Sequence, residues 1–446
     1  MRLRWRSTCG FMTCGVRPHS QLNLSAAALV GYLTIIGGVF IAWLILVVLF
    51  APHIPYHVEA PVDPRSDHFI HVLESTCNTA LDRHNKIEIL TNGTVFYPAM
   101  IDAIRGAQET INLECYIFKK GEVADRFLDA LCERAGAGVH ITIVLDAVGS
   151  FGAFRQVTKR LSHANCRVER YQRLRWYSLA RLNNRTHREL LVIDGRVAFV
   201  GGAGVADWWF TPIGGKPMWR DMMARLEGPI VSNIQGIVAE NWLECSGEIL
   251  TGVRTYQTDH AKGTSPAFAI KSSPADRATF SRVLFQILVE SATRRVLIST
   301  PYFLPDKAFR QAFVRTARLG VEITVIVPGA HNDQQWVRLA SRRMWGDLLK
   351  AGVRIFEYGG GMTHVKALLV DDLWSIIGTT NVDNRSFEHN DEVNVAVRDE
   401  TVTARIASDL LNDLSQSREV TLRDWEHRPV WEKLIGTVAW ILERQQ

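Results

Sequence analysis

Two histidines in matching sequence frames are the residues best suited to do chemistry in this chain. Residues 364–371 read HVKALLVD and residues 187–194 read HRELLVID, and in both copies a glycine follows 14 residues after the histidine. In extended backbone, residues two apart point the same way, so we expect His364 and Lys366 to share a face. An ammonium group can hold a phosphoryl oxygen while an imidazole attacks the phosphorus. The pattern therefore indicates phosphoryl chemistry, encoded twice.

The two copies differ at positions that would bind a phosphate group. Glu189 stands where the second copy has Lys366, and a glycine stands where the second copy has Asn381. The first copy thus lacks one cation and one amide, and a cation–phosphate contact contributes on the order of 1.5–3 kcal/mol. Three interpretations remain open. Arg185 or Arg188 supplies the missing cation, Glu189 binds a hydroxyl group of the substrate, or the site is weak.

A longer internal repeat supplies the elements that must position these motifs. The expected elements of the first copy are helices over 99–107 and 124–135 and strands over 111–116 and 139–146; those of the second are helices over 283–292 and 307–319 and strands over 296–302 and 321–328. Short β-branched runs that alternate with helical patterns are typical of βαβ units. We therefore expect an α/β fold of two pseudo-symmetric βαβ repeats with mixed, mainly parallel sheets.

The sequence divides into seven predicted segments. They are a basic arm at 1–25, an apolar segment at 26–50, a linker at 51–88, the first repeat at 89–247, a connecting segment rich in Gly, Ser and Pro at 248–278, the second repeat at 279–428 and an amphipathic C-terminal helix at 429–446. The apolar stripe of the C-terminal helix has two interpretations. It packs against the domain, or it lies in a membrane interface.

The apolar segment at 26–50 predicts one transmembrane helix before the repeats. Its 25 residues carry no charge, and about 20 apolar residues suffice to span a bilayer as a helix. A secretory signal peptide would have a shorter apolar core and a cleavage site of small residues. Four arginines precede the segment, and acidic residues outnumber basic ones just after it. By the positive-inside rule, we expect a cytoplasmic N-terminus and an extracytoplasmic body in the cell membrane.

Charge and cysteine usage exclude several classes of protein. The net charge is +5, but four of the basic residues lie in the N-terminal arm, which leaves 47 basic against 46 acidic residues in the remainder. A near-neutral body argues against a nucleic-acid-binding protein, which usually carries a strong basic excess. The seven cysteines show neither a CxxC pair nor metal-type spacing, which argues against a disulfide framework and against a zinc site.

Two HxKxxxxD-type motifs at matched offsets within matched repeats resemble the phospholipase D superfamily, and most closely its cardiolipin synthase-like bacterial members. The resemblance extends from about Leu90 to the C-terminus. It includes the Asn92-Gly93 turn and the runs YIF at 116–118 and RLEGP at 225–229. It implies that the two repeats pack about a pseudo-twofold axis and bring both motifs into one site.

The resemblance also implies a role for each motif residue. One histidine forms a phosphohistidine and the other protonates the leaving alcohol, which assigns His187 as the nucleophile and His364 as the general acid and base. Lys366 and Asn381 are expected to contact the phosphate oxygens. The remaining members of the implied catalytic set are carboxylates: Asp221 and Glu392, which orient the histidines, and Asp194 and Asp371, which position the motifs.

The activity implied by the resemblance is phosphatidyl transfer between alcohols, with cardiolipin synthesis from phosphatidylglycerol as the leading hypothesis. The alternative is a phospholipase D that hydrolyses phospholipid to phosphatidic acid; a nuclease and a non-catalytic lipid-binding scaffold are less favoured. The expected partners are a phospholipid membrane and an anionic phospholipid substrate, without nucleic acid. No metal or organic cofactor is implied, because charged side chains can stabilise the phosphoryl group themselves. The sequence leaves the oligomeric state open.

Overall fold

The computed structural model describes residues 26–49, 55–162, 165–172, 184–252, 254–257, 261–274 and 279–443. The chain divides into two units, Met1–His53 and Ile54–Gln446. The predicted basic arm at 1–25 lies outside the described residues. The seven segment boundaries of the sequence analysis stay predictions.

Helix α1 (Ala26–Leu49) is the described part of the first unit. It contains no charged residue, and its large apolar side chains between Leu29 and Trp43 are exposed. A search of the described residues finds no helix that is both long and apolar enough to cross a membrane. The transmembrane helix predicted at 26–50 is therefore not confirmed and stays a prediction.

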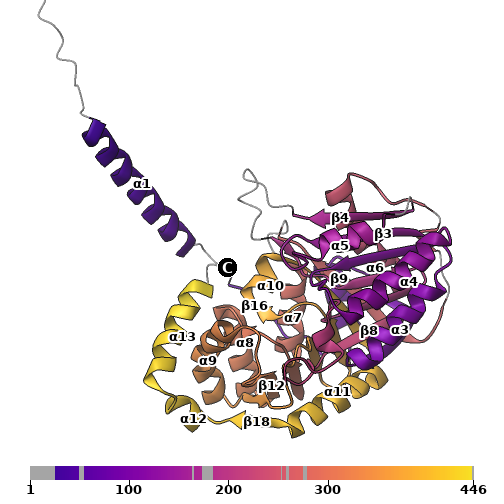
Figure 1. Ribbon diagram of the computed structural model, residues 1–446. Helices are drawn as coiled ribbons and strands as arrows, with labels where there is room; N and C mark the ends of the chain where they lie inside the picture. The colour runs from indigo at the N-terminus through magenta and orange to yellow at the C-terminus, as the bar shows by residue number, and fades with distance from the viewer. Residues whose placement is uncertain are drawn as a thin grey trace, which may run out of the picture. The chain divides into compact units, whose positions relative to one another are not determined.

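The second unit holds both repeats (Figure 1). The described elements up to the end of the first repeat are α2 (Asp67–Thr76), β1 (Asp82–Thr91), α3 (Gly93–Gly106), β2 (Thr110–Cys115), α4 (Glu122–Gly136), β3 (His140–Asp146), α5 (Phe154–Arg160), β4 (Cys166–Tyr171), β5 (Arg185–Thr186), β6 (Leu190–Ile193), β7 (Val197–Gly201), the 3-10 helix η2 (Asp207–Trp209), β8 (Met222–Glu227) and α6 (Ile230–Ser246).

The described elements that follow are β9 (Ser265–Ser272), α7 (Phe280–Ser291), β10 (Arg295–Ser299), β11 (Phe303–Leu304), α8 (Lys307–Arg318), β12 (Glu322–Pro328), α9 (Gln335–Lys350), β13 (Arg354–Tyr358), β14 (Ala367–Val370), β15 (Trp374–Gly378), β16 (Val382–Asp383), α10 (Asn384–Glu388), β17 (Asn390–Arg398), α11 (Glu400–Ser415), β18 (Ser417–Val420), α12 (Leu422–Glu426) and α13 (Val430–Glu443).

The two repeats have the same strand order, which confirms the predicted α/β fold with an internal duplication. The order is β8-β7-β6-β2-β3-β4 in the first repeat and β17-β15-β14-β10-β12-β13 in the second. In each repeat a parallel trio is followed by antiparallel return strands, β6 to β8 in the first and β14, β15 and β17 in the second.

The expectation of mainly parallel sheets is wrong, because antiparallel pairings outnumber parallel ones among the described strands. The physical reason lies in the motif strands. β6 and β7 are joined by only a short turn after Asp194, and a connection that short permits only antiparallel pairing. The sequence pattern indicated the βαβ part of each repeat and missed these hairpins.

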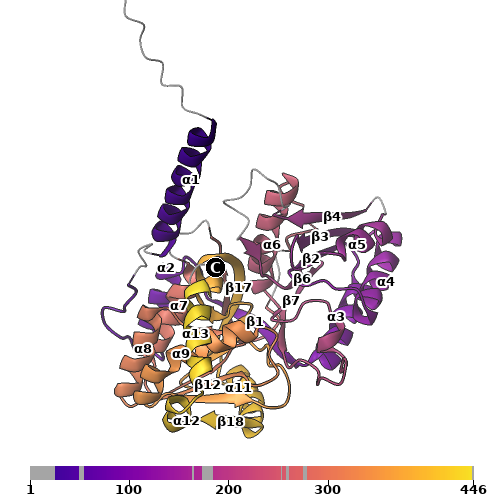
Figure 2. The same cartoon turned by 60° about the vertical axis from the view of Figure 1, so that its left-hand side comes forward.

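The segment predicted as a mere connection, 248–278, contains the central strand β9. It pairs with β17 on one side and with β1 on the other, and β1 in turn pairs with β8. In the described residues the strands therefore form one hydrogen-bonded path through both repeats. Figure 2 shows β1 between the two halves. Gly, Ser and Pro residues around and at the ends of β9 made the segment resemble a loop, although the strand is largely buried.

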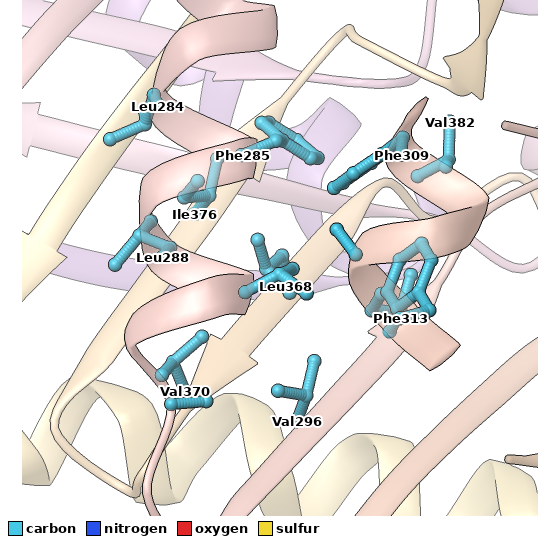
Figure 3. Close-up of a cluster of buried hydrophobic side chains, with 14 of the residues drawn as sticks. Leu284, Phe285, Leu288, Val296, Phe309, Phe313, Leu368, Val370, Ile376 and Val382 are labelled. Atoms are coloured by element: carbon cyan, nitrogen blue, oxygen red, sulfur yellow. The ribbon is translucent and has the colours of Figure 1, made fainter. Parts of the chain in front are cut away.

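Alternate residues of the motif strands face different cores, because successive side chains of a strand point to opposite faces. Leu368 and Val370 of β14 pack in the outer core of the second repeat, under α7 and α8. Figure 3 shows Leu368 between α7, which carries Phe285, and α8, which carries Phe313. The intervening Leu369 packs in an inner core shared by both repeats, together with residues of α6 and α11. The inner core thus holds the two repeats together.

Helix α13 lies along α9 in both ribbon views (Figures 1 and 2). It packs through its polar and small side, where Arg342 Nε donates to Glu432 Oε1 at 2.6 Å. The apolar stripe is turned outward, and its exposed members are Val430, Trp431, Leu434 and Val438. The first interpretation of this stripe, packing against the domain, is therefore wrong for these four residues.

The aspartates that end the two motifs hold the start of the first strand of each repeat. Asp371 accepts hydrogen bonds from the backbone N–H groups of Thr293, Arg294 and Arg295 at 2.7–3.0 Å. Asp194 accepts in the same way from three backbone N–H groups before β2, at 2.8–2.9 Å. Both aspartates have φ near +50°, a conformation that Asp tolerates better than most residues. Each carboxylate therefore ties its motif strand to the neighbouring strand.

We predict that Asp371→Ala lowers the free energy of unfolding by about 2–4 kcal/mol, because it removes several hydrogen bonds to a buried carboxylate. Asp372→Ala is the matched control, since Asp372 also has a positive φ (60°) but lies half-exposed. Urea unfolding of both variants measures the difference. Equal losses in the two variants would show that backbone strain, and not the carboxylate, is responsible.

Candidate active site

Each motif histidine lies in a short extended segment just before a buried strand, His187 before β6 and His364 before β14. Backbone hydrogen bonds tie these segments to the opposite repeat. His364 N donates to Arg220 O at 2.7 Å, and His187 N donates to Asp391 O at 2.9 Å. The two motifs are thereby fixed at the boundary between the repeats.

The residue after each of these backbone partners is a carboxylate that reaches the imidazole. His364 Nδ1 lies 3.0 Å from Asp221 Oδ2, and His187 Nδ1 lies 3.0 and 3.1 Å from the two oxygens of Glu392. Both carboxylates are fully buried. A carboxylate at Nδ1 fixes the tautomer that leaves Nε2 to act, and it raises the basicity of the ring.

Further donors hold the two carboxylates in place. Asp221 accepts from Trp209 Nε1 at 3.1 Å and from the N–H of Met222 at 2.8 Å. Glu392 accepts from the hydroxyl of Thr379 and from Asn390 Nδ2, the latter at 3.3 Å. Each histidine therefore rests on a carboxylate that is itself oriented by neighbouring side chains or backbone.

Lys366 lies directly beside His364, as the spacing predicts. Its Nζ is 3.0 and 3.2 Å from the two ring nitrogens and donates to the backbone carbonyl of His364 at 3.0 Å. Burial lowers the pKa of both side chains, and the positive charge of Lys366 lowers that of His364 further. Without a bound anion, His364 is therefore held as the neutral imidazole.

Both histidines open onto one cavity of about 400 Å³. Asn381 and Arg185 also line it, and Asn381 Oδ1 is buried without a hydrogen-bond partner among the described residues. The other polar and aromatic residues of the lining are Tyr116, Lys119, Trp208, Trp219, Tyr302, Asp333, Gln334, Asp383, Arg385 and Asn390. The structure thus brings His187, His364 and Asn381 together.

Aromatic rings flank both imidazoles, a feature that the spacing of the two motifs does not predict. The Tyr116 ring packs edge-on to His187 at 5.1 Å, and the Trp209 and Trp219 rings each lie 5.5 Å from His364. One signal was present in the sequence. Tyr116 and Tyr302 occupy matched places in the two repeats, 186 residues apart, and both line the cavity.

Of the two arginines predicted to replace the missing lysine, only Arg185 lines the cavity. Its guanidinium is buried, its Nη1 lies 3.6 Å from Asp146, and none of the described residues accepts a hydrogen bond from it. The buried guanidinium of Arg188 points to α6 instead, where it donates to Ile237 O at 3.1 Å and to Glu240 at 2.9 Å. The structure therefore does not bring Arg188 into the cavity.

Glu189 does not line the cavity among the described residues either. Its carboxylate is buried and accepts from the N–H of Ile117 at 3.0 Å. It occupies the space left by Gly204, where an added Cβ would lie 2.8 Å from Glu189 Oε1. Burial raises the pKa of Glu189 to about 8. Glu189 and Gly204, at which the first copy differs from the second, therefore pack together. The neutral side chain of Glu189 lies next to Gly204, which has no side chain.

We predict that Glu189→Gln stabilises the protein increasingly as the pH rises. Between about pH 4.5 and 8 the unfolded chain ionises Glu189 while the folded chain keeps the proton, so folding becomes less favourable with pH in the wild type. Gln mimics the neutral acid at every pH. The gain should be near zero below pH 4.5 and reach at most about 5 kcal/mol above pH 8.

Thermal unfolding of wild type and variant between pH 4.5 and 9 measures this gain. Glu322→Gln, at an exposed position, is the control for the chemical change alone. A Glu189→Gln gain that does not change with pH would contradict a protonated Glu189 in the folded protein.

The sequence matches the family described as "Cardiolipin synthase, PLD-like domain" over residues 100–212 and 286–414, one match in each repeat. It is 31% identical over 380 residues to the major cardiolipin synthase ClsA of Bacillus subtilis, covering 84% of this chain and 78% of that one. It is 30% identical over 345 residues to cardiolipin synthase A of Pseudomonas putida, covering 76% and 70%.

A solved structure shows the same fold. The chain superposes on phosphatidylserine synthase of Haemophilus influenzae with a TM-score of 0.66 and 14% sequence identity, covering 84% of this chain and 99% of that one. The family match extends over both motif-bearing repeats, and the relatives align over most of the chain. The chain therefore belongs to the cardiolipin synthase-like phosphatidyltransferases of the phospholipase D superfamily.

Proposed function

We propose that this protein transfers a phosphatidyl group from one alcohol to another through a phosphohistidine, and that its reaction is cardiolipin synthesis from two molecules of phosphatidylglycerol. One observation carries the proposal. Two imidazoles, each held at Nδ1 by a buried carboxylate of the opposite repeat, open onto one cavity that also presents Arg185 and Asn381. The names of the relatives support the choice of phosphatidylglycerol.

His187 is the proposed nucleophile. Glu392 accepts a hydrogen bond from the Nδ1–H group of His187. The proton therefore stays on Nδ1, and the lone pair of Nε2 is left to attack phosphorus. As the P–N bond forms, the P–O bond to glycerol breaks, and His364 donates a proton to the leaving oxygen. His364 must be protonated for this step, and the negative charge of a bound phosphodiester opposes the effect of Lys366 on its pKa.

The second half-reaction runs the same steps in reverse with a new alcohol. His364, now neutral, removes the proton from the hydroxyl of a second phosphatidylglycerol, whose oxygen attacks phosphorus while the P–N bond to His187 breaks. Asp221 stabilises the imidazolium that forms on His364. The products are cardiolipin and one glycerol, and no nucleotide or metal enters the balance.

The phosphate oxygens are proposed to contact Arg185 and Asn381, which line the cavity, and Lys366, which lies beside His364 but outside the cavity lining. The buried guanidinium of Arg185 lies 3.6 Å from Asp146 but donates no hydrogen bond to the described residues, and burying a guanidinium with unused donors is unfavourable. A phosphodiester would supply the missing acceptors as a bidentate partner. Arg185 thus takes the place of the lysine that the first motif lacks.

Membrane attachment is also proposed. The uncharged segment at 26–50 is proposed as a single transmembrane anchor with a cytoplasmic N-terminus, and the body as extracytoplasmic. The outward apolar stripe of α13, with Trp431 and Leu434, supports contact with a lipid surface. A membrane-bound enzyme would meet both phosphatidylglycerol substrates in one plane.

We predict that the purified protein in detergent converts phosphatidylglycerol to cardiolipin and free glycerol, with phosphatidic acid as the minor product. Water stands at roughly 55 M, so transfer prevails only if the site positions the lipid alcohol and excludes water. Mass spectrometry of the lipid products measures the ratio. If phosphatidic acid is the dominant product, the protein is a hydrolase and the proposed synthase activity is wrong.

We predict that His187→Ala and His364→Ala each lower turnover by at least about 10³-fold, because both half-reactions need both imidazoles. Acid quenching of the enzyme with radiolabelled phosphatidylglycerol should trap labelled protein in the wild type and none in His187→Ala. Labelled protein in His187→Ala, together with none in His364→Ala, would reverse the assignment of the nucleophile.

We predict that Arg185→Gln lowers kcat/KM by about 10- to 100-fold, the value of one charged phosphate contact, whereas Arg185→Lys retains part of the activity. Arg354→Gln is the matched control, because Arg354 is half-exposed and lies outside the cavity lining. Initial rates with phosphatidylglycerol micelles measure the change. Full activity in Arg185→Gln would leave the first motif without a cation for the phosphate.

A further inference from the structure

Two carboxylates of the cavity lining, Asp333 and Asp383, are not used by the proposed steps. Asp383 caps α10, where it accepts a hydrogen bond from the N–H of Ser386 at 2.8 Å, whereas Asp333 caps none of the described helices. Asp333 lies in the loop between β12 and α9 and lines both the main cavity and an adjoining cavity of about 190 Å³. Trp219 also borders both spaces. Asp333 therefore stands where the two cavities meet, and a molecule that extends from one into the other must pass it.

Tyr302 holds this carboxylate. Its hydroxyl donates to Asp333 Oδ2 at 2.6 Å. Burial and the charge of Asp333 together raise the pKa of Tyr302 well above its usual range, so the phenol keeps its proton and remains a donor. A carboxylate accepts several hydrogen bonds at once, so one bond from Tyr302 leaves acceptor capacity facing the cavity.

Asp333 belongs to the His364 side of the cavity. Burial is the main influence on the pKa values of His364 and Lys366 and lowers both, and the negative charge of Asp333 opposes that effect on each. In the first repeat, the loop after β3 contributes Val148 and Gly149 to the lining in place of a carboxylate. The two repeats thus differ at this loop, which brings a carboxylate to the cavity lining in the second repeat and none in the first.

Asp333 is exposed, so water weakens its repulsion of a phosphodiester, but a carboxylate still offers a phosphodiester no attraction. A carboxylate binds hydroxyl groups well, because it accepts short, strong hydrogen bonds from them. The phosphate ligands proposed above are cationic or amide side chains, which can donate hydrogen bonds to phosphate oxygens. An ionised carboxylate cannot donate such a bond. The chemistry of Asp333 therefore points to the alcohol part of the substrate.

We infer that Asp333, positioned by Tyr302, binds the second hydroxyl group of a vicinal diol, the chemical class of a glycerol headgroup, while His364 acts on the first hydroxyl. This inference rests on the proposed function and names the alcohol that the site selects. Water has no second hydroxyl group. The subsite therefore favours transfer to a diol over hydrolysis, in both the departure of glycerol and the arrival of the acceptor.

Competition between matched alcohols tests this subsite. The full-length protein in detergent receives phosphatidylglycerol as donor and equal amounts of propane-1,2-diol, 2-methylpropan-1-ol and 2-aminoethanol as acceptors. The first two alcohols have nearly the same shape and differ in one hydroxyl against one methyl group. The ratio of their phosphatidyl products, measured by mass spectrometry, reports diol selection independently of the overall rate.

We expect the wild type to prefer the diol, and Asp333→Asn to lower that preference on the order of tenfold. Donor consumption should also fall, because the departing glycerol uses the same subsite, but the product ratio does not depend on that rate. Tyr302→Phe should lower the preference in the same direction by less. Asp347→Asn is the matched control, because it makes the same change at an exposed position on α9 outside both cavities and should leave the ratio unchanged.

Two results would overturn the inference. One is an unchanged diol preference in Asp333→Asn. The other is a selective loss of the 2-aminoethanol product in that variant, which would make Asp333 a ligand for an ammonium headgroup. The proposed function fails separately, if the wild type forms no phosphatidyl product with any alcohol.

Discussion

The reciprocal contact between each motif histidine and a carboxylate of the other repeat is the constraint on which the site depends. His364 meets Asp221 and His187 meets Glu392, each at about 3 Å. Neither repeat can complete its own imidazole–carboxylate pair. The inner core shared by the two repeats must therefore form before either imidazole reaches the carboxylate that fixes its tautomer. Catalytic competence thus depends on the packing of β14, β17, α6 and α11, and not on the motifs alone.

Fixing that contact requires the backbone as well as the side chains. Arg220, next to Asp221, exchanges two backbone hydrogen bonds with the segment that carries His364, and its guanidinium donates to Asp413 of α11 at 2.9 Å. The strand pair β5 and β17 does the same for His187. An error of 1 Å in either pairing would move an imidazole off its carboxylate. The register of the sheet, although remote from the chemistry, therefore sets the geometry of the site.

The duplication, the strands of the βαβ units and the contact of Lys366 with His364 follow from periodicity and spacing, because each depends on neighbours in sequence. The direction of the Glu189 side chain in the first copy does not follow from periodicity and spacing. By the rule of alternate residues, Glu189 should share the direction of His187 as Lys366 shares that of His364, yet it turns to the N–H of Ile117 in the space above Gly204. Which side chain faces the cavity was decided by contacts distant in sequence, as it was for Arg185, for Asp333 and for the buried strand β9.

The departures from symmetry acquire a chemical meaning in the proposed reaction. A transfer that proceeds through one covalent intermediate must release the first alcohol and admit the second along the same path, because the second half-reaction retraces the first. One alcohol subsite on the His364 side then serves both steps, so the proposed reaction needs no second copy of it beside His187. Arg185 of the first repeat and Asp333 of the second both line the cavity, and in the proposed reaction the first binds the phosphate and the second binds the alcohol. Two imidazoles in nearly equivalent frames can in this way hold different roles.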